Sequence, residues 1–301
     1  MHIDGYVALA GLIVGVAVGL TGMGGGSLMT PILVLLFGVQ PLAAVSSDLV
    51  ASLIMKPVGA AVHIGHRTVR WALVGWLALG SVPAAFLGVV ALRQFGHGET
   101  VQNVVQLALG AVLLLCVAAV LLRAVIERRR DRSPSSNSAV RSLHVRPLST
   151  IALGAGVGFV LGITSTGSGT LIIVLLLLLY PRLRGSQMVG TDLTQAIPMV
   201  GSAAVAHILF GDFRLGLTLS IITGSIPGVL IGSLVSSRSA TRYIRAALGV
   251  VLLVSGLKLV NVPTPAIGVI LLAAVVAGIV GLTVARLGQR RESSVATQEA
   301  A

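Results

Sequence analysis

Apolar runs long enough to cross a lipid bilayer dominate this chain of 301 residues. A membrane-spanning helix needs about 20 predominantly apolar residues. The runs that meet this requirement are bounded by Arg, Pro or Gly: Pro41–Ile64, Trp71–Leu92, Val101–Leu122, Met188–Phe210, Leu215–Val235, Tyr243–Val260 and Pro265–Leu287. The sequence therefore predicts an all-α integral membrane protein.

The composition excludes most other classes of protein. Hydrophobic residues make up 55% of the chain and charged residues only 10%, whereas a soluble domain carries about 25% charge. This argues against a soluble enzyme and equally against a disordered chain, which needs low hydrophobicity and high charge. Neither glycine cluster is followed by a P-loop lysine, and no His/Cys metal spacing is present. We therefore predict no enzyme activity, no metal and no cofactor.

The strongly basic balance needs an explanation of its own. A net charge of +12 would favour a nucleic-acid partner in a soluble protein. Here aromatic residues are only 4% of the chain, so stacking platforms for single strands are missing, and no DNA-binding signature occurs. We predict no nucleic-acid partner and expect the arginines to set orientation in a membrane.

Two apolar regions are interrupted near their middles. Tyr6–Val39 is broken by Gly22 to Gly26, and Ile151–Tyr180 is broken by Ser165 to Gly169. Each remaining piece has roughly 11–16 residues, fewer than the ~17 that crossing requires. Each region is predicted to be a helical hairpin with its break inside the membrane, where irregular backbone is tolerated only if it lines a cavity or is buried in protein.

The two halves of the chain repeat one another. Gly19 to Leu28 aligns with Gly162 to Leu171 at an offset of 143, which becomes 144 further on. The later matches join Ser47-Asp48-Leu49 with Thr191-Asp192-Leu193, His63-Ile64 with His207-Ile208, and Gly80-Ser81-Val82-Pro83 with Gly224-Ser225-Ile226-Pro227. Apolar composition alone does not align Asp with Asp and His with His, so we infer a duplication. Interrupted segments in corresponding positions of two halves indicate a transporter binding site.

A basic hydrophilic stretch separates the halves. The predicted parts are a first transmembrane repeat (1–122), a basic cytoplasmic linker (123–147), a second repeat (148–260), a final transmembrane helix (261–287) and a polar tail (288–301). Each repeat comprises a broken hairpin followed by three transmembrane helices. Because Lys and Arg gather in cytoplasmic loops, the linker and the C-terminus are placed in the cytoplasm. If neither hairpin crosses, the two repeats are inverted; a single crossing by either would change this topology.

The breaks are the predicted anion site. Helices beginning near Ser27 and Thr170 would expose unpaired N–H groups and partial positive charge at mid-membrane, and glycines allow an anion close to the backbone. The predicted substrate-binding residues are Thr21, Gly22, Gly24, Gly25, Gly26, Ser27, Lys56, Thr164, Ser165, Thr166, Gly167, Ser168, Gly169, Thr170 and Gln195. The alternative is that the glycines only permit close helix packing.

Five ionisable residues lie within the apolar runs: Asp48, Lys56, His63, Asp192 and His207. Charge in a membrane is costly and is usually functional or paired. The two aspartates and two histidines are the predicted coupling residues. The aspartates are alternatively helix N-caps, and the histidines, near span ends, are alternatively interfacial packing residues. Lys56 either attracts an anion or pairs with Asp48, two turns away.

As a set, these motifs resemble the TauE/SafE family of sulfite exporters and related anion permeases. The resemblance covers Tyr6 to Val260. It is carried by Gly22 to Ser27 with Pro31, Ser47 to Leu49, Lys56 to His63, Thr164 to Thr170, Gly190 to Leu193, and His207 with Gly211-Asp212. It implies a bacterial inner-membrane transporter of small organosulfur compounds or sulfur oxyanions, coupled to the proton motive force.

The predicted function is that of a secondary transporter of a small anion, such as sulfite or a sulfonate, working by alternating access. Its partners would be the lipid bilayer, the anionic substrate and a coupling proton. One alternative is a membrane-embedded structural or assembly partner, in which the glycine clusters are packing surfaces. Another is an intramembrane enzyme that uses Asp48 and Asp192 as a carboxylate dyad.

Overall fold

The structure is a computed structural model that describes residues 4–21, 25–96, 98–131, 145–181, 183–235 and 238–273. Every regular element in these ranges is a helix, so the all-α prediction is confirmed there. The helices of the first compact unit are α1 (Gly5–Thr21), α2 (Gly26–Leu35), α3 (Pro41–Gly65), α4 (Trp71–Arg93), α5 (Glu99–Asp131), α6 (Pro147–Thr164), α7 (Thr170–Leu179), α8 (Gly185–Phe210), α9 (Leu215–Val235) and α10 (Arg238–Leu259).

A second unit begins at Asn261. Its described part contains the apolar helix Thr264–Ala273. The rest of the predicted final span, the polar tail and residues 132–144 of the predicted linker lie outside the described residues.

Within the described ranges, six helices are long and apolar enough to cross a membrane: α3, α4, α5, α6, α8 and α9. The prediction of a multi-pass membrane protein is confirmed to that extent. Helix α6 is longer than predicted, which is why it is among the six. The helix starts at Pro147, ahead of the apolar run, and therefore has 18 residues instead of 11–16. Similarly, α1 reaches 17 residues.

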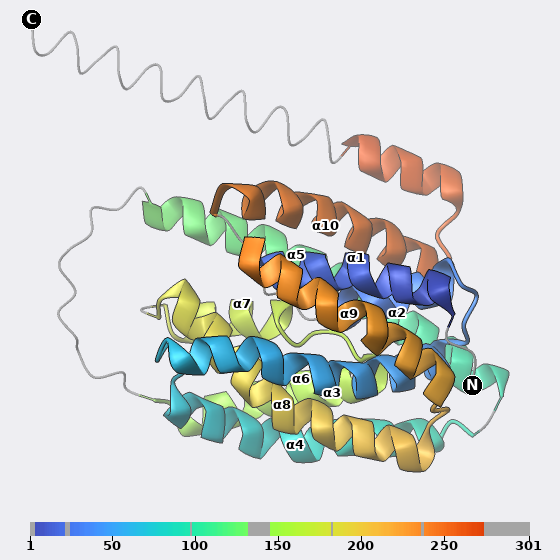
Figure 1. Cartoon of the computed structure of the whole chain (residues 1–301), viewed down its shortest axis with the longest axis horizontal. Coiled ribbons are helices and arrows are strands. Elements are labelled where there is room, and N and C mark those ends of the chain that lie inside the picture. Colours follow the sequence, from blue (N-terminus) through green and yellow to red (C-terminus); the bar gives the residue numbers. More distant parts are fainter. Residues whose placement is uncertain are drawn as a thin grey trace, which may run out of the picture. The chain divides into compact units, whose positions relative to one another are not determined.

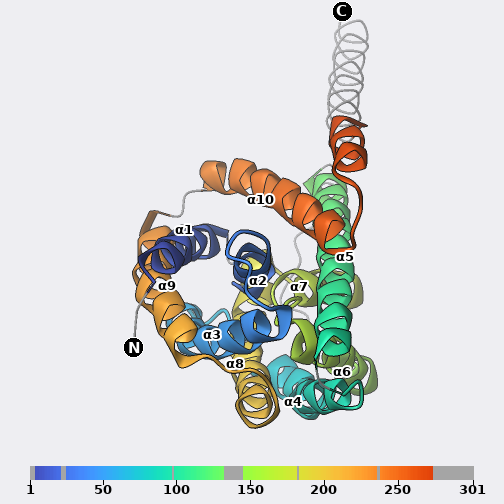
Figure 2. The ribbon, with the colours of Figure 1, turned by 90° about the vertical axis from the view of Figure 1, so that its right-hand side faces the viewer.

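The helices α2 and α7 are much shorter than these spans. Each has ten residues, a length of about 15 Å, against a hydrocarbon core of about 30 Å. Figures 1 and 2 show both helices in the interior of the bundle, α2 toward one end and α7 toward the other. Each begins at a break in the chain, so their first turns lie within the protein.

The second break has the local backbone that its sequence predicts. Ser165, Gly167 and Gly169 have φ angles of +55°, +109° and +92°, a region that glycine adopts without a steric penalty. In the first break Gly25 is helical, with φ −55°. Gly22, Met23 and Gly24 lie outside the described residues, as does the side chain of Thr21.

Glycine-lined contacts hold two pairs of helices together. The helices α1 and α9 run parallel, because Ala8, Leu12 and Val16 meet positions 224, 228 and 232 in the same order. The helices α4 and α6 are also parallel, since Leu77, Ser81 and Ala85 meet positions 154, 158 and 162. A methyl group at any of these six glycines would overlap a backbone carbonyl of the facing helix. Small residues at this spacing let helix backbones approach closely in membranes.

Two further pairs are antiparallel. In α3 and α8, His63 lies against Gly190 and Ser46 lies against His207, at opposite ends of the contact. In α5 and α10, Gly110 packs against Gly256 and Gln106 donates to the carbonyl of Leu259. α3, α5, α8 and α10 surround α2 and α7 (Figure 2).

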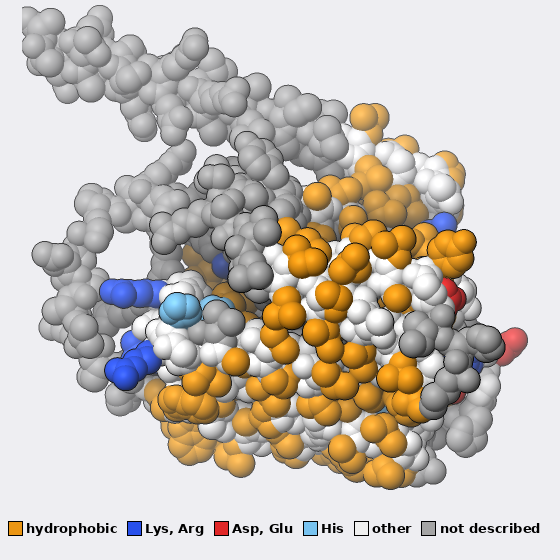
Figure 3. Space-filling view, viewed as in Figure 1, with side chains coloured by type: hydrophobic (Ala, Val, Ile, Leu, Met, Phe, Trp, Pro, Cys, Tyr) orange, Lys and Arg blue, Asp and Glu red, His pale blue; other side chains and the backbone are white. Residues whose placement is uncertain are grey.

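The surface of the bundle is apolar between its ends. Figure 3 shows hydrophobic side chains spread over the face formed by α9, α8 and α4, with Lys, Arg and His at one end and with Asp and Glu, beside further Lys or Arg, at the other. Large side chains such as Leu79, Leu121 and Leu209 are about 60% exposed. Apolar exposure of this extent fits a lipid environment.

Candidate functional site

The second break packs against the first turn of α2, deep inside the bundle. Thr166 Oγ1 donates a hydrogen bond of 3.2 Å to the carbonyl of Gly26. The hydroxyls of Thr30 and Ser165 are 2.7 Å apart. A methyl group on Gly26 would overlap the Ser165 carbonyl and lie 2.9 Å from Asp48 Oδ2. The second break therefore contacts the start of α2 directly, through Thr166 and Ser165.

Asp48 faces this contact from the middle of α3. It is buried, and Thr30 Oγ1 donates to its Oδ2 at 3.1 Å. Seven residues of α3 precede it, so it does not cap its own helix. Its carboxylate is instead directed at the start of α2, the short helix of the same half.

Asp192 has the corresponding position in the second half. It is buried within α8, and its Oδ1 accepts a hydrogen bond of 3.3 Å from the backbone N–H of Gly169. Gly169 directly precedes α7. Each aspartate thus lies at the N-terminus of the neighbouring short helix, and the two carboxylates have different hydrogen-bond partners.

Lys56 joins α3 to the second break. Its Nζ donates to Ser168 Oγ at 2.6 Å, and the side chain is buried. It interacts electrostatically with both Asp192 and Asp48. Because Ser168 accepts this bond, its own hydroxyl hydrogen remains available for another acceptor. The direct partner of Lys56 is therefore the opposite break, across the two halves of the chain.

Polar atoms without a partner lie beside this network. Thr170 Oγ1 and Gln195 Nε2 are buried and have no hydrogen-bond partner within 3.5 Å among the described residues, although the Gln195 side chain interacts with Asp192. Thr170 follows Gly169 at the start of α7, and Gln195 lies one turn after Asp192, with its Oε1 accepting from Ser81. Buried unpaired groups of this kind are costly, so they indicate a place where another molecule supplies the partner.

The remaining predicted residues line the same breaks. Ser27 is buried in the first turn of α2, and Gly25 precedes that helix. Thr164 ends α6, and its hydroxyl donates to the Val160 carbonyl. Gly167 packs against the side chain of Leu171.

His207 lies away from this centre, near the end of α8. It is fully buried; its Nε2 is 2.7 Å from the Gly162 carbonyl and its Nδ1 is 2.8 Å from Ser46 Oγ. Because a carbonyl only accepts, the Nε2 atom carries a proton. The imidazole therefore ties α8 to α6 and α3.

His63 has a looser environment at the end of α3. It is half-buried, and its Nδ1 is 3.1 Å from Thr68 Oγ1 in the turn that follows. Its neighbour on α8 is Gly190. Both histidines, predicted as coupling residues, are thus outside the central cluster.

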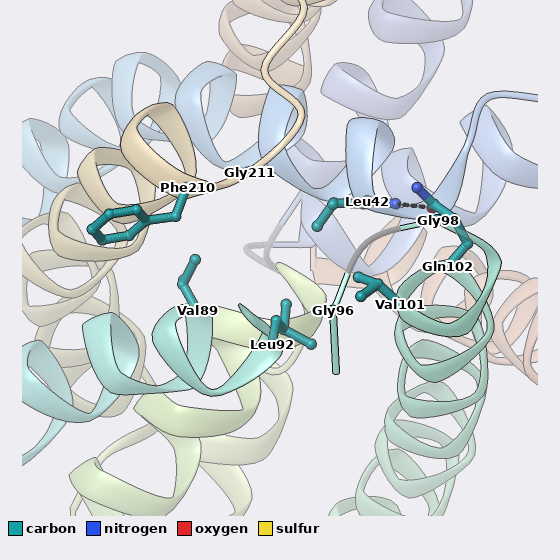
Figure 4. A pocket seen from close by; sticks show the side chains of 9 residues that line it. All are labelled: Leu42, Val89, Leu92, Gly96, Gly98, Val101, Gln102, Phe210 and Gly211. Carbon is teal, nitrogen blue, oxygen red and sulfur yellow. Dashed lines mark hydrogen bonds between the residues drawn. The ribbon is translucent and has the colours of Figure 1, made fainter. Parts of the chain in front are cut away.

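A small pocket opens beside the His207 end of the bundle. It has a volume of about 60 Å³ and is lined by residues at the ends of α4 and α8 and the starts of α3 and α5 (Figure 4). Gln102 crosses it to accept a hydrogen bond from the Leu42 N–H at 2.9 Å. Gly211, in its lining, lies against both His207 and Ser46. The described residues contain no cluster of three or more His, Cys, Asp or Glu side chains that could hold a metal.

Sequence reasoning missed three hydroxyl residues that complete these networks. Thr30, Ser46 and Ser81 bond to Asp48, His207 and Gln195 respectively. One signal was available for Ser81, since it belongs to the repeated Gly-Ser-x-Pro motif. Thr30 and Ser46 match Ile173 and Gly190 in the second half, so the repeat gave no indication of them.

Comparisons with known proteins find similar membrane transporters. The sulfite exporter TauE/SafE family matches residues 7–259. A "probable membrane transporter protein" YjnA of Bacillus subtilis (strain 168) is 38% identical over 84% of this chain and 98% of the relative. A "probable membrane transporter protein" y4hK of Sinorhizobium fredii is 26% identical over 74% of this chain and 85% of the relative. No solved structure matches the chain.

Proposed function

The chain belongs to the sulfite exporter TauE/SafE family of membrane transporters, and from this premise we propose that it carries a small anion through the site between its two breaks. A small-molecule substrate and a membrane location follow from the family. The anion, which we propose to be sulfite, a sulfonate or a related sulfur compound, is our inference from the chemistry of the site. This function requires no catalytic group.

One observation carries the proposal. Thr170 Oγ1 is a buried donor without a partner among the described residues. It directly follows Gly169, whose N–H donates to Asp192, and the Gln195 amide interacts with the same carboxylate. The N-terminus of α7 adds partial positive charge, and Lys56 adds a full charge through Ser168. Hydroxyl, amide and N–H donors around one cation are suited to a small oxyanion.

We further propose that the two halves are inverted repeats that exchange access between the two membrane faces. Directions in the bundle support this. The turn between α3 and α4 reverses the chain, and so does the turn between α8 and α9. Helix α3 is antiparallel to α8, whereas α1 is parallel to α9 and α6 is parallel to α4. It follows that α1 is antiparallel to α6, its counterpart in the second half. Inverted repeats of this kind support alternating access around a central site.

The distribution of arginines supports an orientation in a bacterial inner membrane. Several arginines lie in turns at one end of the bundle. Arg67 and Arg70 follow α3, Arg146 precedes α6, and Arg184 lies between α7 and α8. Arg146 and Arg184 precede α6 and α8, which both start from that end. Positively charged loops favour the cytoplasmic side. The proposal places this end and the linker in the cytoplasm.

Uptake into proteoliposomes tests the function directly. The purified full-length chain should take up labelled sulfite or methanesulfonate, with and without a pH gradient, faster than empty vesicles. Thr170→Val should reduce uptake about tenfold, whereas Thr223→Val, which alters an exposed hydroxyl on α9, should leave it unchanged. Failure of the wild-type chain to move either anion under any gradient would refute the proposal.

A further inference from the structure

We propose that the anion crosses together with one proton, and that Asp48 carries this proton while Asp192 stays ionised. The inference rests on the proposed function and concerns the same site. Its basis is the number of charges at the centre of the bundle and the kind of donor that each carboxylate accepts from.

The buried charges are balanced before the anion binds. Asp48 and Asp192 contribute two negative charges and Lys56 one positive charge. The N-termini of α2 and α7 each contribute about +0.5 elementary charge, which brings the sum close to zero. A bound monoanion leaves one negative charge without compensation in a medium where isolated charge is very costly. One added proton restores the balance, so the substrate class is a monoanion, such as a sulfonate or hydrogensulfite.

The hydrogen bonds of Asp48 can reverse direction when it is protonated. In the ionised state the Thr30 hydroxyl donates to Asp48, the Ser165 hydroxyl also interacts with this carboxylate, and the two hydroxyl oxygens are 2.7 Å apart. In the protonated state Asp48 donates to Thr30, and Thr30 donates to Ser165, because each hydroxyl both donates and accepts. No polar group loses its partner in this exchange.

Asp192 lacks a partner that can reverse in this way. Its Oδ1 accepts from the backbone N–H of Gly169, which only donates and so cannot accept the O–H of a protonated carboxyl. That N–H belongs to the start of α7, where the helix favours negative charge, and Lys56 interacts electrostatically with Asp192. Protonation of Asp192 would weaken these interactions, so the proton goes to Asp48.

No other ionisable group on the neighbouring helices takes this role. The helices packed against α3 are α2, α5, α8 and α9. Helices α2 and α9, together with α6 and α7 at the breaks, contain no ionisable side chain. Helix α5 has its charges at its two ends, and α8 contributes only Asp192 and His207. On α3 itself, the groups beside Asp48 are Lys56 and, at the far end, His63.

The test separates proton coupling from anion transport. Full-length protein in proteoliposomes would be given labelled methanesulfonate, which stays a monoanion across the working pH range. One proton per anion makes transport electroneutral, so a pH difference of one unit should accumulate the anion about tenfold. A valinomycin-imposed potassium potential alone should accumulate none.

The variants then identify the proton carrier. Asp48→Asn should retain exchange of internal for external methanesulfonate within about threefold of wild type, but lose accumulation driven by the pH gradient. Asp192→Asn, the matched control, should lose both. Accumulation by Asp48→Asn equal to that of wild type would overturn the inference while leaving the proposed function standing. So would wild-type uptake driven by the potential.

A measurement on the unaltered chain covers the case in which Asp48→Asn does not fold. A pH-sensitive dye inside the vesicles should record one proton entering with each methanesulfonate. Anion uptake without proton uptake refutes the coupling. No movement of methanesulfonate or hydrogensulfite in uptake or in exchange refutes the proposed function, and this inference with it.

Discussion

The contact between the breaks makes two adjacent glycines differ sharply in what they tolerate. A methyl group on Gly26 would overlap the carbonyl of Ser165 and crowd Asp48. On Gly25 it would meet the Met55, Val18 and Ser52 side chains at ordinary distances of 3.7–4.0 Å. Overpacking of a rigid site costs about 1–3 kcal/mol. Gly25 already has helical dihedral angles, so alanine there should gain up to about 1 kcal/mol by restricting the unfolded chain.

Thermal unfolding and anion uptake should therefore separate the two variants. A change of 1 kcal/mol moves the melting temperature of a chain this size by about 2–4 °C. Gly26→Ala should melt about 2–12 °C below wild type and transport at least about tenfold more slowly, because Ser165 and Asp48 are displaced. Gly25→Ala should match or exceed the wild-type melting temperature, because its methyl group meets side chains only at ordinary contact distances. Equal melting temperatures and equal uptake in the two variants would show that the breaks do not touch at Gly26.

Three further substitutions test separate parts of the bundle. Thr170→Val removes a buried hydroxyl without a described partner; it should raise stability without substrate by about 1 kcal/mol and abolish most of the stabilisation by added sulfite in a thermal-shift assay. Gly158→Ala should lower stability by about 1–3 kcal/mol, because its methyl overlaps the Ser81 carbonyl, whereas Gly156→Ala, which faces open space, should not. His207→Leu leaves the Gly162 carbonyl and Ser46 without this partner and should cost about 2–4 kcal/mol in denaturant unfolding, more than His63→Leu.

The helices and the breaks were predictable because their signals are local. The limits of α9 coincide with those predicted from its apolar run, and Ser165 to Gly169 form the predicted interruption. The length of α6 was not predictable from hydropathy, because its first turn comprises Pro147, Leu148, Ser149 and Thr150. Proline suits a first helical position, so the helix starts before the apolar run does.

The contacts that build the site are not local, and the sequence could not assign them. Lys56 and Ser168 are separated by 112 residues, and their contact depends on how the two halves pack. Spacing along α3 favoured Asp48 as the partner of Lys56, since both lie on one helix face. In the structure Asp48 accepts from Thr30 and Lys56 donates to Ser168, while the two charges still interact electrostatically. The helical periodicity of a sequence can indicate which side chains of one helix lie close together. It cannot indicate which side chains of the two repeats meet.

The differences between the halves carry as much information as the repeat does. Under the proposed inversion, His63 on α3 and His207 on α8 are equivalent positions at opposite membrane faces. His207 is fully buried and bonded to α3 and α6, while His63 is half-buried and bonded only within its own turn as far as the described residues show. A transporter with inverted repeats has to hold its halves in different conformations whenever access is one-sided. Under the proposed alternating access, the tighter packing at His207 is the kind of difference between the two ends that one-sided access requires.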